Sequence, residues 1–339
     1  MSEPIRCVGL MSGGLDSILA TRCMVELGFD VHCINFRSPF CTCTAKSASC
    51  SAAEAAVRQI GDVPLHVQVV GDDYLDVIKA PKRGTGRGMN PCLDCRTFKF
   101  QEAWRYAESI GARFLFTGEV LGQRPMSQHR RALDLIDKDS GLQGLVLRPL
   151  SAQLLPETIP EKEGWVDREK LLAFSGRTRR PQMALAAEFG IDEYPCAAGG
   201  CLLTDKGFAA RLRDLIDIHP DCAAVDMHPL KAGRHFRTPD GAKIIVGRNH
   251  AENRRLLALD PPGTRIIIDG PAPVVIVQDV FGEDAVALGL DAAFCHANLP
   301  DGDPLKLSVR DPEGNERDVV RTPSATRADL RSQMDAWRL

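Results

Sequence analysis

The stretch from Ile5 to Leu27, IRCVGLMSGGLDSILATRCMVEL, decides the fold of the first part of this chain. The apolar run Ile5–Leu10 predicts a buried strand, and the pattern over Ser17–Leu27 predicts a helix. Between them lies Ser12–Ser17, SGGLDS, with two glycines where the strand ends and the helix begins. Glycines there let backbone N–H groups converge on an anion, and a helix N-terminus adds the positive end of a dipole. The stretch therefore predicts a phosphate-binding turn.

The polar residues of this turn indicate which kind of phosphate site it is. Ser12 and Ser17 can donate hydroxyl hydrogen bonds, while Asp16 can cap the helix or help to hold Mg²⁺. No lysine follows the glycines, so the turn is not the phosphate loop of NTPases that cleave between the β and γ phosphates. The alternative is a glycine-rich turn with a capping aspartate and no ligand.

Strand and helix patterns continue to alternate outward from the turn. The predicted elements are strands Val31–Phe36, Leu65–Val70, Phe114–Thr117 and Leu145–Arg148, and helices Ala52–Ile60, Tyr74–Ala80 and Arg96–Ile110. This order predicts an α/β fold, a parallel sheet with helices on both faces. Ligands of such sheets collect beyond the carboxyl ends of the strands, which is where Ser12–Ser17 lies.

The pattern changes near residue 205. Short strand-like runs separated by Pro, Asp and Gly turn signals then replace the alternation. The predicted elements are Ala209–Ile216 (a helix), strands His235–Arg237, Lys243–Val246, Thr264–Ile268, Val274–Val277 and Leu305–Arg310, and helices His250–Leu259 and Ala325–Trp337. We expect one domain over residues 1–204 and a smaller α+β domain over residues 205–339.

The composition is that of an ordinary globular protein, with 44% hydrophobic and 26% charged residues among 339. A net charge of −3 provides no global attraction for nucleic acid, so RNA contacts must come from local patches. No apolar run approaches the roughly 18 residues of a membrane helix, and the N-terminus lacks a secretory pattern. We therefore predict a cytoplasmic protein with no membrane partner.

Twelve cysteines are many for a protein of a reducing compartment, where a disulfide framework is not expected. Five lie in apolar patterns or stand alone and are predicted to be small core residues, namely Cys7, Cys23, Cys33, Cys222 and Cys295. Seven fall in polar or Gly/Pro-rich loops, namely Cys41, Cys43, Cys50, Cys92, Cys95, Cys196 and Cys201. These loop cysteines are candidates for metal, cluster or sulfur chemistry.

The pair Cys92-x-x-Cys95 is the strongest of these candidates. With one distant loop cysteine it makes three thiolates, which would leave one iron of a [4Fe–4S] cluster open. We prefer Cys201, which follows two glycines, to Cys196 as the third ligand. Persulfide chemistry without a metal, a structural zinc and inert thiols stay as alternatives. The group Cys41, Cys43 and Cys50 can bind zinc or be ordinary loop cysteines, and we leave it out of the metal site.

Several motifs resemble known families. Ser12–Ser17 resembles the PP-loop of the ATP pyrophosphatases, which cleave ATP between the α and β phosphates. Thr117–Gln123 (TGEVLGQ) with Ser127-Gln128, and Arg148–Leu150 (RPL), resemble motifs of the tRNA 4-thiouridine synthetases. Asn90–Cys95 (NPCLDC) with Phe98–Phe100 (FKF) resembles a region of the related tRNA 2-thiouridylases. These matches follow one another in the expected order over residues 8–203.

The resemblance implies the PP-loop fold of the adenine nucleotide alpha hydrolases and transfer of AMP to a uridine carbonyl oxygen, which sulfur then replaces. Its cofactors would be ATP, Mg²⁺ and a [4Fe–4S] cluster. The implied nucleotide-binding residues are Met11, Ser12, Gly13, Gly14, Asp16, Ser17, Phe36, Gly118, Gln123 and Arg124. The implied catalytic residues are Asp16, Cys92, Cys95 and Cys201, of which the three cysteines are also the implied metal ligands.

The second domain resembles the NFACT-type RNA-binding domain through Arg234–Phe236, the turn Pro239–Gly241 and the stretch Val246–Asn253 (VGRNHAEN). Asn249 is placed to cap the helix that opens at His250. The arginines of this stretch, Arg248, Arg254 and Arg255, are candidates for phosphate contacts, or are merely solvated. Beside a catalytic half that resembles tRNA thiolases, RNA binding is the better hypothesis.

Together these observations predict an ATP-dependent tRNA sulfurtransferase that forms 4-thiouridine. Its partners would be tRNA and a sulfur donor, either sulfide or the persulfide of a cysteine desulfurase. The alternatives are a PP-loop ligase or amidotransferase acting on a small molecule, a cluster-free persulfide enzyme, and a non-catalytic RNA-binding factor. The oligomeric state stays open, with a homodimer as one option.

Overall fold

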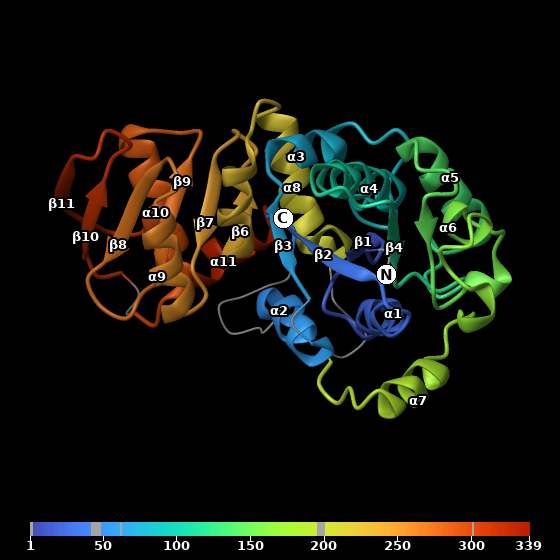
Figure 1. Cartoon of the computed structure of the whole chain (residues 1–339). Helices are drawn as coiled ribbons and strands as arrows, with labels where there is room; N and C mark the ends of the chain where they lie inside the picture. Colours follow the sequence, from blue (N-terminus) through green and yellow to red (C-terminus); the bar gives the residue numbers. More distant parts are fainter. Residues whose placement is uncertain (1–2, 42–48, 62, 195–200, 300–301) are drawn as a thin grey trace. The chain divides into compact units, whose positions relative to one another are not determined.

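The computed structural model describes residues 3–41, 49–61, 63–194, 201–299 and 302–339 of the chain. The chain divides into two compact units, Met1–Asp205 and Lys206–Leu339, which we call unit 1 and unit 2 (Figure 1). No described helix is long and apolar enough to cross a lipid bilayer.

Unit 1 is built on a five-stranded sheet in the order β3-β2-β1-β4-β5. Its strands are β1 (Arg6–Leu10), β2 (Asp30–Arg37), β3 (Leu65–Val69), β4 (Phe114–Thr117) and β5 (Val146–Leu147). All of its neighbouring strands are parallel. A hydrophobic core lies on each face of this sheet, and alternate residues of a strand point to opposite faces. In β1, Cys7 therefore packs in one core and Val8 in the other.

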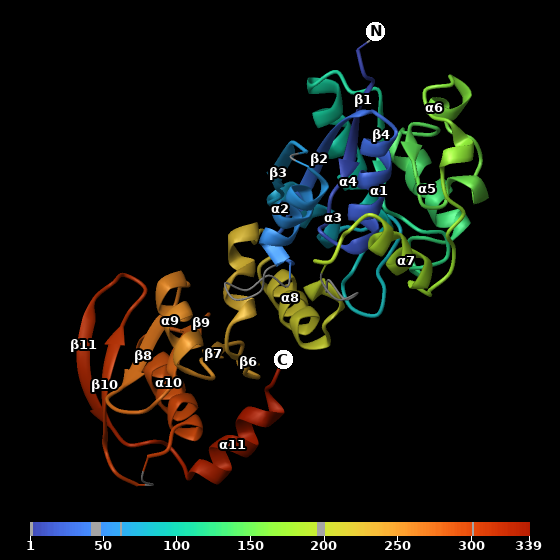
Figure 2. The ribbon, with the colours of Figure 1, turned by 60° about the horizontal axis from the view of Figure 1, so that its bottom comes forward.

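Helices cover both faces of this sheet, as predicted (Figures 1 and 2). The core around Cys7 includes residues of α1 (Leu15–Glu26), α2 (Ser49–Ile60) and α7 (Arg180–Glu188). The core around Val8 includes residues of α4 (Cys92–Ser109) and α5 (Arg130–Ser140). The remaining helices of unit 1 are α3 (Asp72–Lys79), which packs on α4, and the single turn α6 (Ile159–Lys162). The α/β fold class is confirmed.

Helix α4 begins at Cys92, whereas the sequence predicted its start at Arg96. Cys92 and Cys95 therefore lie in the first turn of a helix, and the prediction that they lie in a loop was wrong. Asp94 in this turn accepts the amide of Arg83 at 2.9 Å, which ties the preceding basic loop to the helix. Pro91 is the residue before the helix, a position where its missing N–H breaks no helical hydrogen bond.

Unit 2 contains a six-stranded antiparallel sheet in the order β11-β10-β8-β9-β7-β6. Its strands are β6 (Arg234–Arg237), β7 (Lys243–Val246), β8 (Thr264–Ile268), β9 (Val274–Gln278), β10 (Leu305–Arg310) and β11 (Glu316–Arg321). Helices α10 (Gly282–His296) and α11 (Arg327–Ala336) pack on one face, and α9 (His250–Leu259) packs on the other. Helix α8 (Lys206–Ile218) precedes the sheet. Its α+β character is as predicted.

Two elements of unit 2 were not predicted. Strand β11 alternates little in polarity and is mostly exposed, so its strand conformation follows from pairing with β10. Helix α10 is mostly apolar, and eight of its residues are buried. It therefore lacks the alternation of an apolar and a polar face by which an amphipathic helix is recognised in a sequence.

The stretch Val246–Asn253 forms a compact turn that holds the end of β7 to α9. Asn249 caps α9 as predicted, because its Oδ1 accepts the amide of Glu252 at 3.0 Å. Asn253 Oδ1 accepts the amide of Val274 at 3.2 Å and lies so close to Gly247 that a side chain there would overlap it. The glycine and the second asparagine of this motif therefore have a structural role.

Candidate functional site

The loop Ser12–Ser17 lies between the carboxyl end of β1 and the start of α1. Gly13 has a φ of 76°, and a Cβ there would lie 2.6 Å from the backbone of Ala52, so this position requires glycine. Ser17 Oγ donates to the carbonyl of Gly14 at 2.8 Å and lies 3.2 Å from Ser12 Oγ. The loop is thus a tight turn at a helix N-terminus, where Gly14 offers no side chain to cap the first turn.

Gly118 and Gln123, which follow β4, contact this turn from the neighbouring strand. Gly118 packs so closely against the backbone of Asp16 and Ser17 that a side chain would overlap both residues. Gln123 Nε2 donates to Asp16 Oδ2 at 2.9 Å. The structure thus brings together Asp16, Gly118 and Gln123, which are far apart in the sequence.

Asp16 is a carboxylate whose second oxygen lacks a partner. Burial raises the pKa of Asp16, while Gln123 and the positive charges of Arg179 and Arg124 act in the opposite direction. Its Oδ1 is buried and has no hydrogen-bond partner of normal geometry among the described residues, although Gln182 lies close enough to lower the pKa of Asp16. Gln123 Oε1 and Arg179 Nε are also buried without a hydrogen-bond partner among the described residues. Buried polar groups are nearly always satisfied, so these orphaned atoms fit a site that a nucleotide phosphate and its cation complete.

The other predicted nucleotide residues lie as follows. Met11 is buried, and its carbonyl accepts Asn35 Nδ2 at 2.7 Å. Phe36, near the end of β2, is partly buried and packs with the core around Val8. Arg124 is exposed, close enough to Asp16 to lower its pKa. The sequence analysis missed Arg179, which comes from the start of α7.

A buried ion network stands behind Gly118. The Glu119 side chain is fully buried and pairs with Arg96 of α4 at 2.8 Å and with Arg148 at 3.1 Å. Arg148 pairs in turn with Asp137 of α5 at 2.7 Å. Burial alone would raise the pKa of Glu119, but the guanidinium groups of Arg96 and Arg148 outweigh it and hold the pKa below its usual range. The network joins α4, α5 and the loop after β4.

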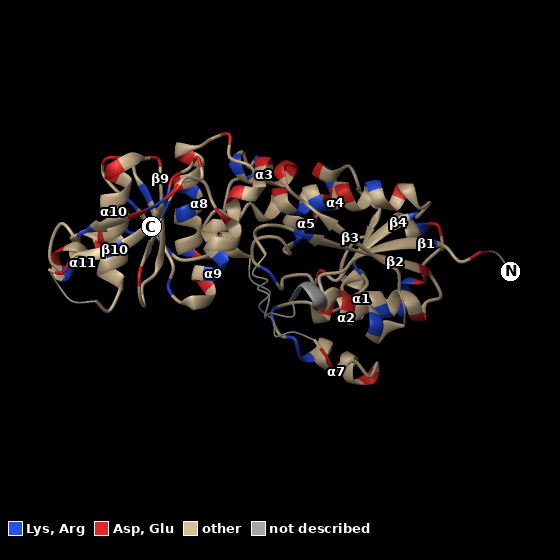
Figure 3. Cartoon of the chain, turned by 90° about the vertical axis from the view of Figure 1, so that its left-hand side faces the viewer, with Lys and Arg blue, Asp and Glu red and all other residues tan. Residues whose placement is uncertain are grey.

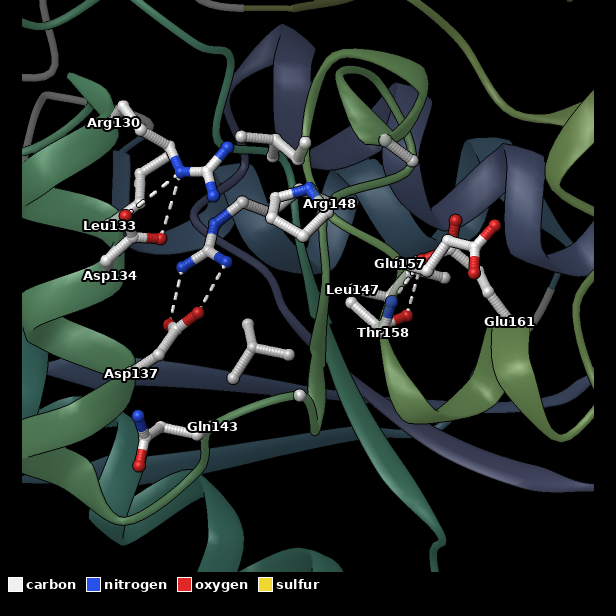
Figure 4. A pocket seen from close by; sticks show the side chains of 15 residues that line it. Arg130, Leu133, Asp134, Asp137, Gln143, Leu147, Arg148, Glu157, Thr158 and Glu161 are labelled. Carbon is white, nitrogen blue, oxygen red and sulfur yellow. Dashed lines mark hydrogen bonds and ion pairs between the residues drawn. The ribbon is translucent and has the colours of Figure 1, made fainter.

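Figure 4 shows the outer side of this network, where Arg148 points at Asp137 and Arg130 points at Asp134. These residues line a cavity of about 260 Å³, together with Gln143, Glu157 and Glu161. None of the predicted nucleotide or cysteine residues lines it. We therefore place the candidate site at the turn Ser12–Ser17 rather than in this cavity.

Cys41 and Cys201 lie side by side although they are far apart in the sequence. They face each other in an isolated antiparallel bridge, and the amide of Leu202 donates to the carbonyl of Phe40 at 3.0 Å. A hydrogen bond between these flanking residues makes the two cysteines a non-hydrogen-bonded pair, the type in which Cα atoms are closest, about 4.5 Å apart. The sequence analysis set Cys41 aside, and the structure brings it to Cys201.

The loop before α4 brings the Cys92–Cys95 pair to the same place. The amide of Met89 donates to the carbonyl of Leu203 at 2.9 Å. Burial raises the pKa of Cys201 to about 11, and the nearby thiols of Cys95 and Cys92 contribute in the same direction. The three cysteines predicted to act together are therefore neighbours.

Two side chains donate hydrogen bonds to these sulfur atoms. The hydroxyl of Tyr74, a buried residue of α3, donates to Cys95 Sγ at 2.9 Å. Asn90 Nδ2 donates to Cys92 Sγ at 3.2 Å. Burial raises the pKa of Tyr74, as do the nearby sulfurs of Cys95, Cys201 and Cys41, so the phenol stays a neutral donor. Neither Tyr74 nor Asn90 was identified from the sequence.

Asn90 also connects the cysteines with the nucleotide side of unit 1. Its Nδ2 lies 3.5 Å from the sulfur of Met126, three residues after Gln123. The segment from Gly118 to Met126 thus contacts Asp16 at one end and the partner of Cys92 at the other. One short loop spans both candidate sites.

The fit of a metal to the cysteines is partial. Cys92, Cys95 and Cys201 are neighbouring thiols of the kind that iron–sulfur clusters require, and hydrogen-bond donors already point at two of them. Within the described ranges, no three Cys, His, Asp or Glu side chains are arranged to hold a metal ion. Cys43 and Cys196 lie outside the described residues, and Cys50 lies in the first turn of α2.

The remaining cysteines confirm the prediction of core positions. Cys7, Cys33, Cys222 and Cys295 are buried, and Cys23 of α1 is partly buried against the same core as Cys7. Burial raises the pKa of Cys33 to about 12, which keeps this thiol protonated. Burial also raises the pKa of Cys7, Cys23 and Cys295, as expected for structural thiols in apolar surroundings.

Comparisons with known proteins identify the family of this chain. The family described as "Thiamine biosynthesis protein (ThiI)" matches residues 5–154, and the family "NFACT protein RNA binding domain" matches residues 233–334. The chain is 31% identical over 306 residues to a tRNA-specific 2-thiouridylase of Magnetococcus marinus. This alignment covers 83% of this chain and 79% of that relative. The chain belongs to the PP-loop family that includes the tRNA-specific 2-thiouridylases.

Two curated relatives match over a shorter part of the chain, and two solved structures are more distant. The alignment spans only about a third, 34%, of two further curated 2-thiouridylases, both of Leptospira biflexa. Among solved structures, a 4-thiouridine synthetase–RNA complex with bound ATP is 23% identical, with a TM-score of 0.37 and coverage of 64% of this chain and 50% of that one. The U34-tRNA thiolase NcsA of Methanococcus maripaludis, with its [4Fe–4S] cluster, is 16% identical, with a TM-score of 0.35 and coverage of 64% and 68%.

Replacement of Glu119 by Gln should lower the free energy of unfolding by about 3 kcal/mol at pH 7, because the change leaves two guanidinium groups around an uncharged side chain. The folded-state pKa of Glu119 lies below its unfolded value, so its contribution is complete above about pH 4.3 and is lost as the pH falls through the folded pKa. Urea unfolding at pH 7 and pH 3 measures both effects.

The control variant is Glu108→Gln, at an exposed position of the same helix as Arg96. It should change the free energy of unfolding by less than about 0.5 kcal/mol. Equal stability of Glu119→Gln and wild type at pH 7 would contradict the network.

Oxidation with diamide should join Cys41 to Cys201, because non-hydrogen-bonded antiparallel partners lie within the Cα range of disulfides. Peptide mass spectrometry after alkylation should identify this crosslink, and Cys41→Ser should abolish it. Cys23→Ser, which changes a partly buried thiol of α1, should leave it intact. If Cys201 pairs with another cysteine while Cys41 stays alkylated, the placement of Cys41 is incorrect.

Proposed function

We propose that this protein is an ATP-dependent tRNA sulfurtransferase, which adenylates a uridine carbonyl oxygen and replaces that oxygen with sulfur. The observation that supports this function most is the single loop from Gly118 to Met126, which contacts Asp16 and, through Asn90, the environment of Cys92. An enzyme that couples activation to sulfur transfer needs both chemistries within reach of one base. Membership of the PP-loop family supports the same assignment.

The turn Ser12–Ser17 is suited to hold the phosphates of ATP. The glycines let the backbone approach, the start of α1 favours negative charge, and the hydroxyls of Ser12 and Ser17 can donate. Asp16 Oδ1 is the free oxygen for Mg²⁺, and Gln123 fixes the other oxygen. Arg124 and Arg179 can neutralise charge on the reacting phosphate. We assign Met11, Phe36 and Gly118 to the remaining contacts with the nucleotide.

Adenylation is a chemical requirement of this reaction. A uridine carbonyl carbon is a weak electrophile, and its oxygen is a poor leaving group until it is joined to a phosphate. Transfer of AMP corrects both, and diphosphate leaves. Positive side chains beside Asp16 would stabilise the charge that develops on the phosphate.

The sulfur site is assigned to Cys92, Cys95 and Cys201. These three thiols would hold a [4Fe–4S] cluster, and such a cluster with three protein ligands supplies an open iron where sulfide can bind. Tyr74 and Asn90 would keep Cys95 and Cys92 oriented by their hydrogen bonds. A persulfide on one of these cysteines, without a metal, is the alternative carrier, and its sulfur would come from the persulfide of a cysteine desulfurase. Free sulfide would be a donor only for the open iron of the cluster.

Unit 2 is assigned to tRNA binding, because the RNA-binding family matches residues 233–334. The product is assigned as 4-thiouridine from the motif Thr117–Gln128, whereas the curated relatives are named 2-thiouridylases. Nucleoside analysis separates these two products because 2-thiouridine and 4-thiouridine differ in retention and fragmentation.

Purified protein incubated with unmodified tRNA, ATP, Mg²⁺ and sulfide should form one thiolated nucleoside, detected by mass spectrometry after digestion. Asp16→Asn should lower the rate at least 100-fold, because it removes the oxygen assigned to Mg²⁺ and the charge at the phosphate site. Asp134→Asn, which changes a surface carboxylate paired with Arg130, should keep the wild-type rate. Absence of any thiolated nucleoside, together with ATP cleavage driven by a small carboxylic acid, would establish a small-molecule ligase instead.

Protein purified without oxygen should be brown and contain about four iron atoms and four sulfides per chain if the three cysteines hold the proposed cluster. Cys92→Ser and Cys201→Ser should lower the iron content at least twofold, and Cys23→Ser should not change it. Colourless, iron-free protein that still thiolates tRNA would rule out the cluster and favour the persulfide.

A further inference from the structure

The end of the chain forms an additional edge of the sheet in unit 2. The amide of Arg237 donates to the carbonyl of Trp337 at 2.9 Å, and the amide of Leu339 donates to the carbonyl of His235 at 3.0 Å. Phe236 and Arg338 are bridge partners in this antiparallel pairing. Cross-strand partners project from the same face of a sheet, so Arg338 lies on the face of Phe236.

Arg234 lies on that face as well, because it is two residues before Phe236 in strand β6. The ring of Phe236 stacks on His296, the last residue of α10, with 5.9 Å between the ring centroids. Arg331 of α11 donates to the carbonyl of Cys295 at 3.3 Å, next to His296. Arg234, Arg331 and Arg338 therefore gather around His296 from three chain segments, and we call them the arginine cluster.

The members of this cluster differ from the other arginines of the sheet in lacking ionic partners. Across the described part of unit 2, no carboxylate lies within 4.0 Å of any of the three. By contrast, Arg317 and Arg321 both pair with Glu283. Figure 3 shows that Lys and Arg positions otherwise alternate with Asp and Glu positions along the ribbon of this unit. The cluster is a local positive patch on a protein with a net charge of −3.

The charged groups that face the cluster do not neutralise it. Glu252 is engaged by Arg248 at the end of β7 and by the amide of Gly233. Asp335 is the other nearby carboxylate. Burial and then the charges of Arg234, Arg331 and Arg338 lower the pKa of His296 to about 4, so this imidazole is neutral at pH 7. Its Nε2 has no hydrogen-bond partner among the described residues.

We propose that Arg234, Arg331 and Arg338, which surround the neutral imidazole of His296, bind the phosphate backbone of tRNA. Guanidinium groups match phosphate oxygens in geometry and charge, and mutual repulsion among the three arginines is relieved when anions bind. Phosphate contacts carry no sequence information, so the cluster positions RNA and does not select a base. This inference rests on the proposed function, since it names the surface of unit 2 that holds the substrate.

The cluster differs from the phosphate contacts that the sequence predicted. Arg248 is held by Glu252 in a bidentate pair, which leaves its guanidinium less available than those of Arg234 or Arg338. Arg254 and Arg255 belong to α9, which packs on the opposite face of the sheet from α10. Arg254 and Arg255 are therefore separate from the cluster, whereas Arg248 lies close enough to Arg234 to lower its pKa.

The test compares tRNA binding by the full chain and by two charge-matched double variants. Arg234→Ala/Arg338→Ala removes two members of the cluster, and Arg317→Ala/Arg321→Ala removes two arginines that pair with Glu283. Fluorescence anisotropy with labelled tRNA, over a series of salt concentrations, should give at least a tenfold weaker Kd for the cluster variant. The slope of log K against log salt should become shallower by about 0.9 for each duplex phosphate that the variant no longer neutralises. The control should stay within twofold of the wild type.

Further measurements separate three negative outcomes. A variant can fail to fold, the protein can fail to thiolate tRNA, or the arginine cluster can fail to bind tRNA. Both variants should keep the thermal unfolding midpoint of the wild type within a few degrees. In the thiolation assay the cluster variant should raise KM for tRNA and keep kcat, since the turn Ser12–Ser17 is unchanged. Unchanged Kd and salt slope in Arg234→Ala/Arg338→Ala, or an equal weakening in the control, would overturn the proposal. Salt-dependent binding that disappears in the cluster variant supports it even if the wild type thiolates no tRNA.

Discussion

A single buried carboxylate, Glu119, holds the functional half of this protein together. It is fully buried with Arg96 and Arg148 as partners, and charges buried in this way are stable only while each has its counterion. Arg96 lies one turn after Cys92 and directly follows Cys95, and Gly118 directly precedes Glu119. The ion network therefore fixes the helix of the cysteine pair relative to the loop that contacts Asp16. A shift of either element would separate a buried charge from its partner.

The same region explains why three distant segments meet at the cysteines. Backbone hydrogen bonds join Leu202 to Phe40 and Leu203 to Met89, so the segment 201–204 is held between two loops of the sheet edge. Cys201 thereby reaches both Cys41 and the Cys92–Cys95 pair. Tyr74 lies among these sulfurs as a neutral donor. Backbone pairing, rather than side-chain affinity, assembles this group of thiols.

Much of the fold could be predicted because its signals are local. The parallel sheet follows from apolar runs alternating with amphipathic ones, and strand ends were located within one or two residues, as for β8 and β10. Elements without a local signal were missed. Strand β11 is exposed and charged, so only pairing with β10 defines it. Helix α4 begins earlier than predicted, because Asp94 and the preceding loop stabilise a first turn that contains two cysteines.

The sequence by itself determined the tight turn Ser12–Ser17, since Gly13, Gly14 and Ser17 lie within a few residues of each other and the conformation of such a turn is local. It also determined the candidate thiols Cys92, Cys95 and Cys201. Only the tertiary structure decided that Cys41 belongs beside Cys201, that Glu119 has two arginine partners, and that Arg234, Arg331 and Arg338 form one patch. These groups come together through strand pairing and burial over long sequence separations, and no pattern of neighbouring residues encodes such contacts.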